Sequence, residues 1–100
     1  MASRSGGVVN TATGSFTGAG AAVTLTLGFV PARVTVFNST DATKWEKYYD
    51  MAAATTIKVV TAGTMTADSG SAIVINTDGT VTLSATLAAS GKACTWVASA

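Results

Sequence analysis

Histidine is absent from this 100-residue chain, and cysteine and proline each occur only once. A serine or cysteine nucleophile would therefore lack its commonest general base, and a zinc site would need one thiol and a few carboxylates. Cys94 has no cysteine partner, and we expect it to be a small buried side chain. We predict that the chain is not an enzyme and holds no cofactor or metal. An enzyme with a serine or Cys94 nucleophile is the competing class.

Charged residues are also scarce, at 11% of the chain, compared with about 25% in ordinary soluble domains. The two signs are interspersed and the net charge is +1, so no basic stripe is present to bind phosphate groups. No apolar run reaches the roughly 18 residues that a membrane span needs, and no apolar leader opens the sequence. We expect no nucleic-acid partner, no membrane partner and synthesis in the cytoplasm.

Hydrophobic residues make up 48% of the chain, but 19 of the residues counted in that fraction are alanine. A core with few large side chains leaves a small surplus over the entropy lost on folding. A surface poor in charge suits a protein that partners partly cover. These two features predict contacts with other subunits.

Threonine is abundant, with 18 residues, and it alternates with apolar residues in several segments. Alternation with a period of two is typical of half-buried strands, and it is clear at 23–27, 33–37 and 93–98. We predict an all-β fold, a small antiparallel β-sandwich or barrel. Residues 1–22 are expected to form an extended N-terminal arm, and residues 23–100 a single β domain.

The segment Lys44–Met51 is compatible with two structures. Trp45, Tyr48 and Tyr49 have the spacing of one helical face, with a capping box at its start. Alternation also fits, aromatic residues favour strands, and the neighbouring segments are β. We therefore prefer a strand and keep the helix as the alternative.

Two later segments share the turn pattern Thr-x-Gly-Thr, at 61–64 and 77–80. Each lies between short runs rich in β-branched residues, which indicates a β-hairpin. In the second hairpin a two-residue turn would mix the two faces, whereas a three-residue loop that ends in Gly79 builds one apolar face. The facing pairs are then Ile73 and Leu83, Ile75 and Val81, and, by the same rule in the first hairpin, Val59 and Met65.

Candidate partner-binding residues come from two places. Lys44–Met51 combines aromatic and charged side chains, as interface anchors do; alternatively, Trp45 and Tyr49 belong to the core and the charges face solvent. The predicted arm holds one basic residue and one large apolar residue that could anchor on a neighbouring subunit. The candidates are Arg4, Phe16, Lys44, Trp45, Lys47, Tyr48 and Tyr49.

The stretch Gly28-Phe29-Val30-Pro31-Ala32-Arg33-Val34-Thr35-Val36-Phe37-Asn38-Ser39-Thr40-Asp41, followed by Glu46 and Asp50-Met51, resembles a group of small virion proteins of tailed bacteriophages. Thr61-Ala62-Gly63-Thr64 and Ser90-Gly91-Lys92 with Trp96 match later parts of the same pattern. The resemblance covers residues 25–98.

This resemblance implies a structural role in the phage particle. The expected function is that of a capsid cement or decoration protein that binds the major capsid protein on the capsid exterior. Because capsid positions repeat by symmetry, such a protein is expected to be a homo-oligomer or to bind at a local symmetry axis. A tail, baseplate or fibre module that binds a glycan or receptor is the alternative. The resemblance transfers no catalytic residues.

Overall fold

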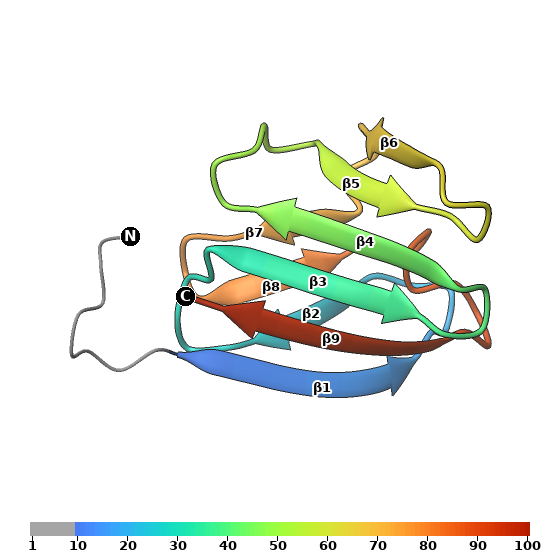
Figure 1. The fold of residues 1–100 in the computed structure, drawn as a ribbon. Helices are drawn as coiled ribbons and strands as arrows, with labels where there is room; N and C mark the ends of the chain where they lie inside the picture. The colour runs from blue at the N-terminus through green and yellow to red at the C-terminus, as the bar shows by residue number, and fades with distance from the viewer. Residues whose placement is uncertain (1–9) are drawn as a thin grey trace.

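The computed structural model describes residues 10–100, and these residues form two antiparallel sheets without a helix (Figure 1). The six-stranded sheet has the strand order β1-β9-β3-β4-β5-β6, and the three-stranded sheet has the order β2-β8-β7. The all-β prediction is confirmed, and the two sheets are arranged as a small β-sandwich. The strands are β1 (Thr11–Thr17), β2 (Val23–Thr26), β3 (Arg33–Asn38), β4 (Thr43–Tyr48), β5 (Thr56–Val59), β6 (Met65–Asp68), β7 (Ile73–Ile75), β8 (Thr80–Leu83) and β9 (Ala93–Ser99).

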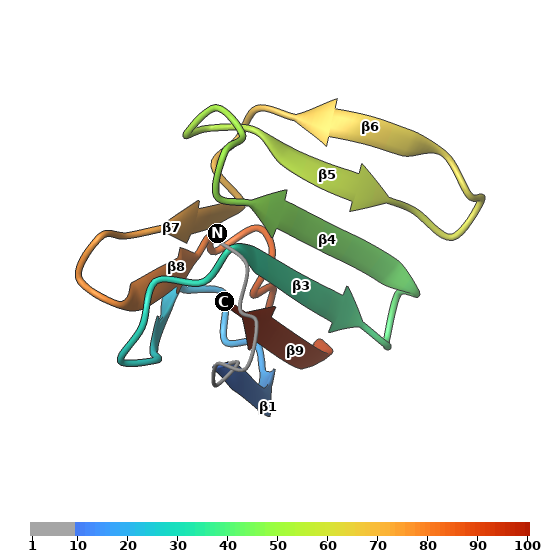
Figure 2. The same cartoon turned by 60° about the vertical axis from the view of Figure 1, so that its left-hand side comes forward.

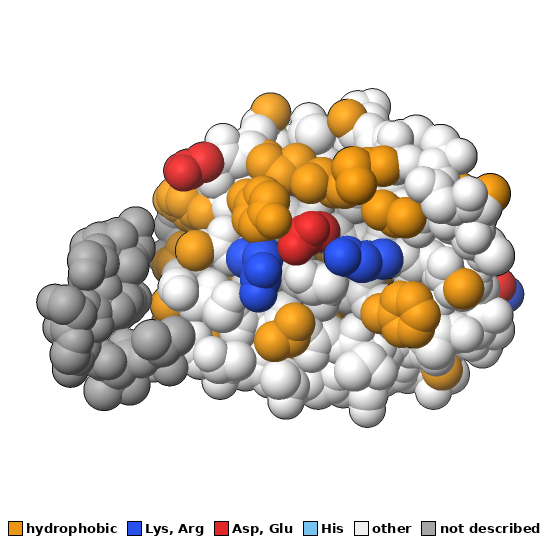
Figure 3. Space-filling view, in the orientation of Figure 1, with side chains coloured by type: hydrophobic (Ala, Val, Ile, Leu, Met, Phe, Trp, Pro, Cys, Tyr) orange, Lys and Arg blue, Asp and Glu red, His pale blue; other side chains and the backbone are white. Residues whose placement is uncertain are grey.

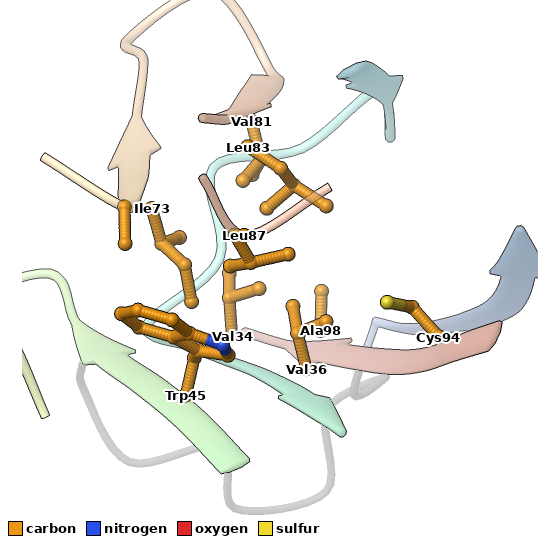
Figure 4. Packing of buried hydrophobic residues seen from close by; sticks show 10 residues of the cluster. Val34, Val36, Trp45, Ile73, Val81, Leu83, Leu87, Cys94 and Ala98 are labelled. Atoms are coloured by element: carbon orange, nitrogen blue, oxygen red, sulfur yellow. The ribbon is translucent and has the colours of Figure 1, made fainter. Parts of the chain in front are cut away.

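The core lies between the two sheets. The smaller sheet covers the central strands of the larger one, and β5 and β6 extend beyond it (Figure 2). Figure 4 shows Trp45 from β4 and Val34 and Val36 from β3 pointing toward Leu83 and Leu87 on the opposite side. The side chains of these five residues are at most 4% exposed. Large side chains are few, as the composition predicts, but they are gathered in one cluster.

Strand β1 corrects the predicted boundary of the N-terminal arm. Thr11–Thr17 is not outside the β domain, because it pairs with all seven residues of β9 at the edge of the six-stranded sheet. Ala12, Gly14 and Phe16 face inward and are half-buried. The Trp96 ring lies against Gly14 so closely that an added Cβ would be 2.8 Å from it. The β domain therefore begins before residue 23.

The ambiguous segment is a strand, as preferred. In a helix, Trp45 and Tyr48 would share one face, whereas β4 sends Trp45 into the core and Tyr48 to the surface. The choice follows from the neighbours, because β4 pairs with β3 on one side and with β5 on the other. Tertiary pairing decides the structure of a segment whose local pattern permits both forms.

Both predicted hairpin registers are confirmed. Each loop has its glycine in the left-handed region, with φ of 87° at Gly63 and at Gly79. This is the position where a three-residue loop requires φ above zero. The facing pairs are those predicted, namely Val59 and Met65, Ile75 and Val81, and Ile73 and Leu83.

Candidate interaction face

The face of the six-stranded sheet that is turned away from the three-stranded sheet carries a mixture of charged and apolar side chains. Its position follows from alternation, since each buried residue of β3 and β4 is followed by one that points to the other side. Nine residues on this side define what we call the outer face: Arg33, Phe37, Lys44, Glu46, Tyr48, Ile57, Val59, Met65 and Val97.

Charges of both signs lie in the middle of the outer face. Figure 3 shows one acidic group between two basic groups there. They come from paired strands, Arg33 on β3 and Glu46 and Lys44 on β4. Thr35 on β3 donates a hydrogen bond of 3.4 Å from its Oγ1 to Oε2 of Glu46. No ion pair to these three residues occurs within residues 10–100, so their charges remain available to a partner.

Apolar side chains lie on both sides of this charged row (Figure 3). Phe37 is 44% exposed, Tyr48 is 41% exposed and Met65 is 69% exposed. Ile57, Val59 and Val97 are half-buried and fill the space between the exposed residues. Aromatic residues, methionine and arginine are the types that protein interfaces favour. The outer face therefore combines exposed residue types that interfaces favour with a central row of charges.

A shallow hollow of about 440 Å³ adjoins the outer face at the end of β4. It is held in shape by the chain that leaves β4, because Tyr49 N–H donates to the Ala32 carbonyl at 2.9 Å. Tyr49 at its rim is 49% exposed and Val30 is 39% exposed. Tyr48 lines the hollow and also belongs to the outer face, so the two features form one continuous surface. The lining residues are Val30, Pro31, Ala32, Tyr48, Tyr49, Asp50 and Ala100.

The structure separates the predicted partner-binding residues into groups. Lys44 and Tyr48 lie on the outer face, and Tyr49 lies at the hollow. Trp45 belongs to the core, as the alternative interpretation had it, and the ammonium of Lys58 lies 4.7 Å from the centre of its ring. Arg4 lies outside the described residues.

Phe16 and Lys47 are explained by contacts within the chain. Phe16 packs against the core cluster, so its burial requires no neighbouring subunit. Lys47 is 2% exposed, and its Nζ donates to the carbonyls of Ala52 at 2.5 Å, Ala53 at 3.1 Å and Thr55 at 2.7 Å. Burial lowers the pKa of Lys47 from its ordinary value. Lys47 thus holds the loop between β4 and β5 and is corrected from a binding residue to a structural one.

Sequence reasoning missed Arg33, Phe37 and Val30 as surface residues. The signal for the first two was present in the strand 33–37, whose valines alternate with Arg33, Thr35 and Phe37. Since Val34 and Val36 are fully buried, the residues between them must face outward. Val30 gave no such signal, because its exposure depends on how the chain turns before Pro31.

Cys94, the nucleophile of the competing enzyme prediction, lies in the core cluster. Cys94 is 1% exposed, and burial, with a smaller effect of the Asp41 charge, raises the pKa of its thiol above the ordinary value. The reactive thiolate form is therefore disfavoured. Within residues 10–100, no three residues of the His, Cys, Asp and Glu types gather where they could hold a metal ion. Within the same range, no helix is long and apolar enough to cross a membrane.

Comparison with models of known protein families, with curated proteins and with solved structures found no match. No residue role can therefore be transferred to this chain from a relative. The candidate site rests on its own geometry, which is that of an exposed, mixed apolar and charged sheet face with an adjoining hollow.

Proposed function

We propose that this protein is a capsid cement or decoration protein of a tailed bacteriophage and that it binds the major capsid protein on the capsid exterior. The observation that carries the proposal is the outer face, where Phe37, Tyr48 and Met65 are exposed around a row of charges. These charges form no ion pair within residues 10–100. Surfaces of this composition are typical of protein interfaces. The sequence resemblance across residues 25–98 supplies the kind of partner.

The architecture of the protein fits this role. A cement protein has to supply area between subunits that are already assembled, and stable interfaces bury about 800 Å² on each partner. A six-stranded sheet presents a broad face on a rigid support, and its side chains are held by the pleat rather than by a loop. The buried thiol and the absence of histidine fit a protein that binds rather than reacts.

Binding to capsids that lack the protein tests the proposal. We expect the purified protein to bind such capsids and to raise their melting temperature. Arg33→Glu reverses a charge on the outer face, and Phe37→Ser removes an exposed aromatic ring. Each should weaken binding by about tenfold or more, because residues at the centre of an interface cost over 1 kcal/mol when they are changed.

Thr24→Glu is the matched control. Thr24 is an exposed strand residue on the three-stranded sheet, so this variant changes surface charge without touching the outer face and should bind like the wild type. The proposal fails if the wild-type protein does not bind the capsids. If Thr24→Glu weakens binding as much as Arg33→Glu does, the outer face is not the contact surface.

A tail, baseplate or fibre module is the second candidate, and the hollow beside Tyr49 favours it. Two tyrosines and Asp50 line this hollow, and aromatic rings with a carboxylate are groups that can contact a sugar ring. Counting copies in the particle distinguishes the two functions. A cement protein is expected in hundreds of copies, and a baseplate or fibre part in tens or fewer. In the second case, Tyr49→Ala should reduce glycan binding while Phe37→Ser leaves it unchanged.

A further inference from the structure

Strand β1 lies at an edge of the six-stranded sheet and contributes no residue to the outer face. Within residues 10–100, β9 is the only strand that pairs with β1. Gly18 N–H donates to the Lys92 carbonyl at 2.9 Å, and Ala100 N–H donates to the Asn10 carbonyl at 2.9 Å. Both bonds lie in the register of the β1 and β9 pairs.

These bonds determine which backbone groups of β1 face outward from the sheet. In an antiparallel pair the hydrogen-bonded residues recur at every second position. The even-numbered residues between Asn10 and Gly18 therefore bond to β9. The N–H and C=O groups of the four residues between them point to the open edge: Thr11, Thr13, Ser15 and Thr17.

Among the described residues, nothing gives the β1 edge the usual protection against pairing. Sheet edges are normally shielded by charges, proline, bulges or very short strands. Thr11–Thr17 has no charged residue and no proline, and its register with β9 runs through seven pairs without a bulge. The other edges are shorter, with four residues in β6 and β2 and three in β7, and β6 carries Asp68. Of the sheet edges that residues 10–100 form, the β1 edge is the longest open one.

We propose that β1 pairs with β1 of a second copy of this chain, in antiparallel orientation and around a two-fold axis at Gly14. In this register Thr13 faces Ser15 of the second copy, and Thr11 faces Thr17. Each of these residues directs its N–H and C=O to the edge, so every one of the edge groups gains a partner. A shift by one residue would set edge-directed groups opposite groups that are already bonded to β9.

The side chains also match in this register. On the outward side, the pairs are threonine with serine and threonine with threonine, which stabilise antiparallel strands by hydrogen bonding. On the inward side, Ala12 faces Phe16 of the second copy, which extends the apolar layer beneath the sheet. Gly14 faces itself where the strands approach most closely. No like charges face one another across this pairing. A second copy of the chain is therefore a suitable partner for the β1 edge.

Pairing would join two six-stranded sheets into one continuous sheet across the two-fold axis. The inference rests on the edge alone and does not depend on the proposed capsid function. It concerns how the protein associates with itself, whereas the outer face concerns the capsid. Failure of one therefore leaves the other intact.

The test is the mass of the full chain in solution, measured by light scattering over micromolar to millimolar concentrations. We expect the mass to rise to twice 9.9 kDa. The double variant Thr13→Lys, Ser15→Lys sets two lysines opposite each other at both central pairs and should stay at the single-chain mass. The double variant Thr13→Glu, Ser15→Glu should do the same. An equal mixture of the two should restore the dimer, because each lysine then faces a glutamate.

The mixture also controls for folding, since only folded chains can restore the dimer. A wild-type protein that stays at the single-chain mass overturns the proposal, as does a lysine variant that remains dimeric or a mixture that remains monomeric. Association that persists unchanged in the lysine variant would indicate pairing through another edge and would also overturn it. Hydrogen exchange of the wild type gives an independent check, because the amides of Thr13 and Ser15 should become protected as concentration rises. Equal exchange at all concentrations contradicts the pairing.

Discussion

The two hairpins that share the Thr-x-Gly-Thr turn have the same local structure and different surroundings. Both place a glycine at φ of 87°, and both pair their strands by the same loop rule. In the hairpin of β7 and β8, Val81 is fully buried, whereas the equivalent Met65 in the hairpin of β5 and β6 is 69% exposed. Turn chemistry therefore sets the register of a hairpin, and its position in the sandwich sets how much it stabilises the fold.

Truncation at the two equivalent positions should show the largest difference between the hairpins. We expect Val81→Ala to lower the free energy of unfolding by about 2–3 kcal/mol, because it removes buried methyl groups and leaves a cavity. Met65→Ala should change it by less than about 0.5 kcal/mol, as surface substitutions do. Chemical denaturation of both variants measures this. Similar losses of stability in the two variants would mean that the Met65 side chain on β6 is buried in solution.

Lys47 links the exposed hairpin to the sheet, and its removal should affect that hairpin selectively. Lys47→Met leaves the carbonyls of Ala52, Ala53 and Thr55 without their donor. Hydrogen bonds to charged groups contribute about 1.5–3 kcal/mol each, offset here by the cost of burying the ammonium. We expect a net loss of about 2 kcal/mol.

Hydrogen exchange locates the effect of Lys47→Met. The amides of β5 and β6 should exchange faster, and those of β7 and β8 should not change beyond the global loss of stability. Lys44→Met is the matched control, because Lys44 lies on the same strand but faces solvent. If Lys44→Met lowers the free energy of unfolding as much as Lys47→Met does, the loss of the bonds to the loop carbonyls is not the cause.

Replacing the two loop glycines by alanine should give a smaller difference in the free energy of unfolding. Gly63→Ala and Gly79→Ala each introduce a side chain in the left-handed region, at a cost of about 1–2 kcal/mol. A Cβ at Gly79 would also lie 3.2 Å from the Phe29 nitrogen, whereas nothing lies within 4 Å at Gly63. We expect Gly79→Ala to be more destabilising by about 1 kcal/mol. Equal melting temperatures would show that Phe29 moves aside freely.

The smallest effect is expected from the one turn residue that the hairpins do not share. Asp78 Oδ1 accepts hydrogen bonds from Thr80 Oγ1 at 2.6 Å and Thr80 N–H at 3.1 Å, and these bonds lower the pKa of Asp78 below its ordinary value of 3.8. Ala62 occupies the equivalent position. Asp78→Ala should slightly lower the melting temperature at pH 7, and Ala62→Asp should slightly raise it.

The pH dependence of these two variants follows from the direction of the pKa shift. Because the carboxyl group of Asp78 loses its proton more readily in the folded state, its stabilisation is present above pH 3.8 and is lost as the pH falls through the lower folded-state pKa. Thermal melts at pH 7 and pH 2 should show the difference between Asp78→Ala and wild type shrinking in acid. A difference that grows in acid would contradict this role.

Local features of the fold were predictable from the sequence. The register of Ile75 and Val81 depends only on loop length and on a side-chain period of two, which are both visible in ten neighbouring residues. Strand β1 was missed because Thr11–Thr17 has a single large apolar residue and its partner β9 lies at the other end of the sequence. Pairing between distant segments leaves little local signal.

The candidate site was predictable only in part for the same reason. Alternation within β4 places Lys44 and Tyr48 outward, and the sequence contains that information. The burial of Lys47 depends on three carbonyls of a loop whose path the sequence does not show. The sequence therefore predicts Lys47 at the surface, whereas three backbone carbonyls bind its ammonium in the interior.

The position of β9 between β1 and β3 has a consequence for the order of folding. Hairpins such as those of β3 with β4 and β7 with β8 connect neighbouring segments and can close quickly, whereas β9 must return across most of the chain to reach β3. Strand β1 has no place to dock until that step is complete. The first strand in the sequence is therefore among the last to join the sheet, and folding should be limited by the arrival of β9.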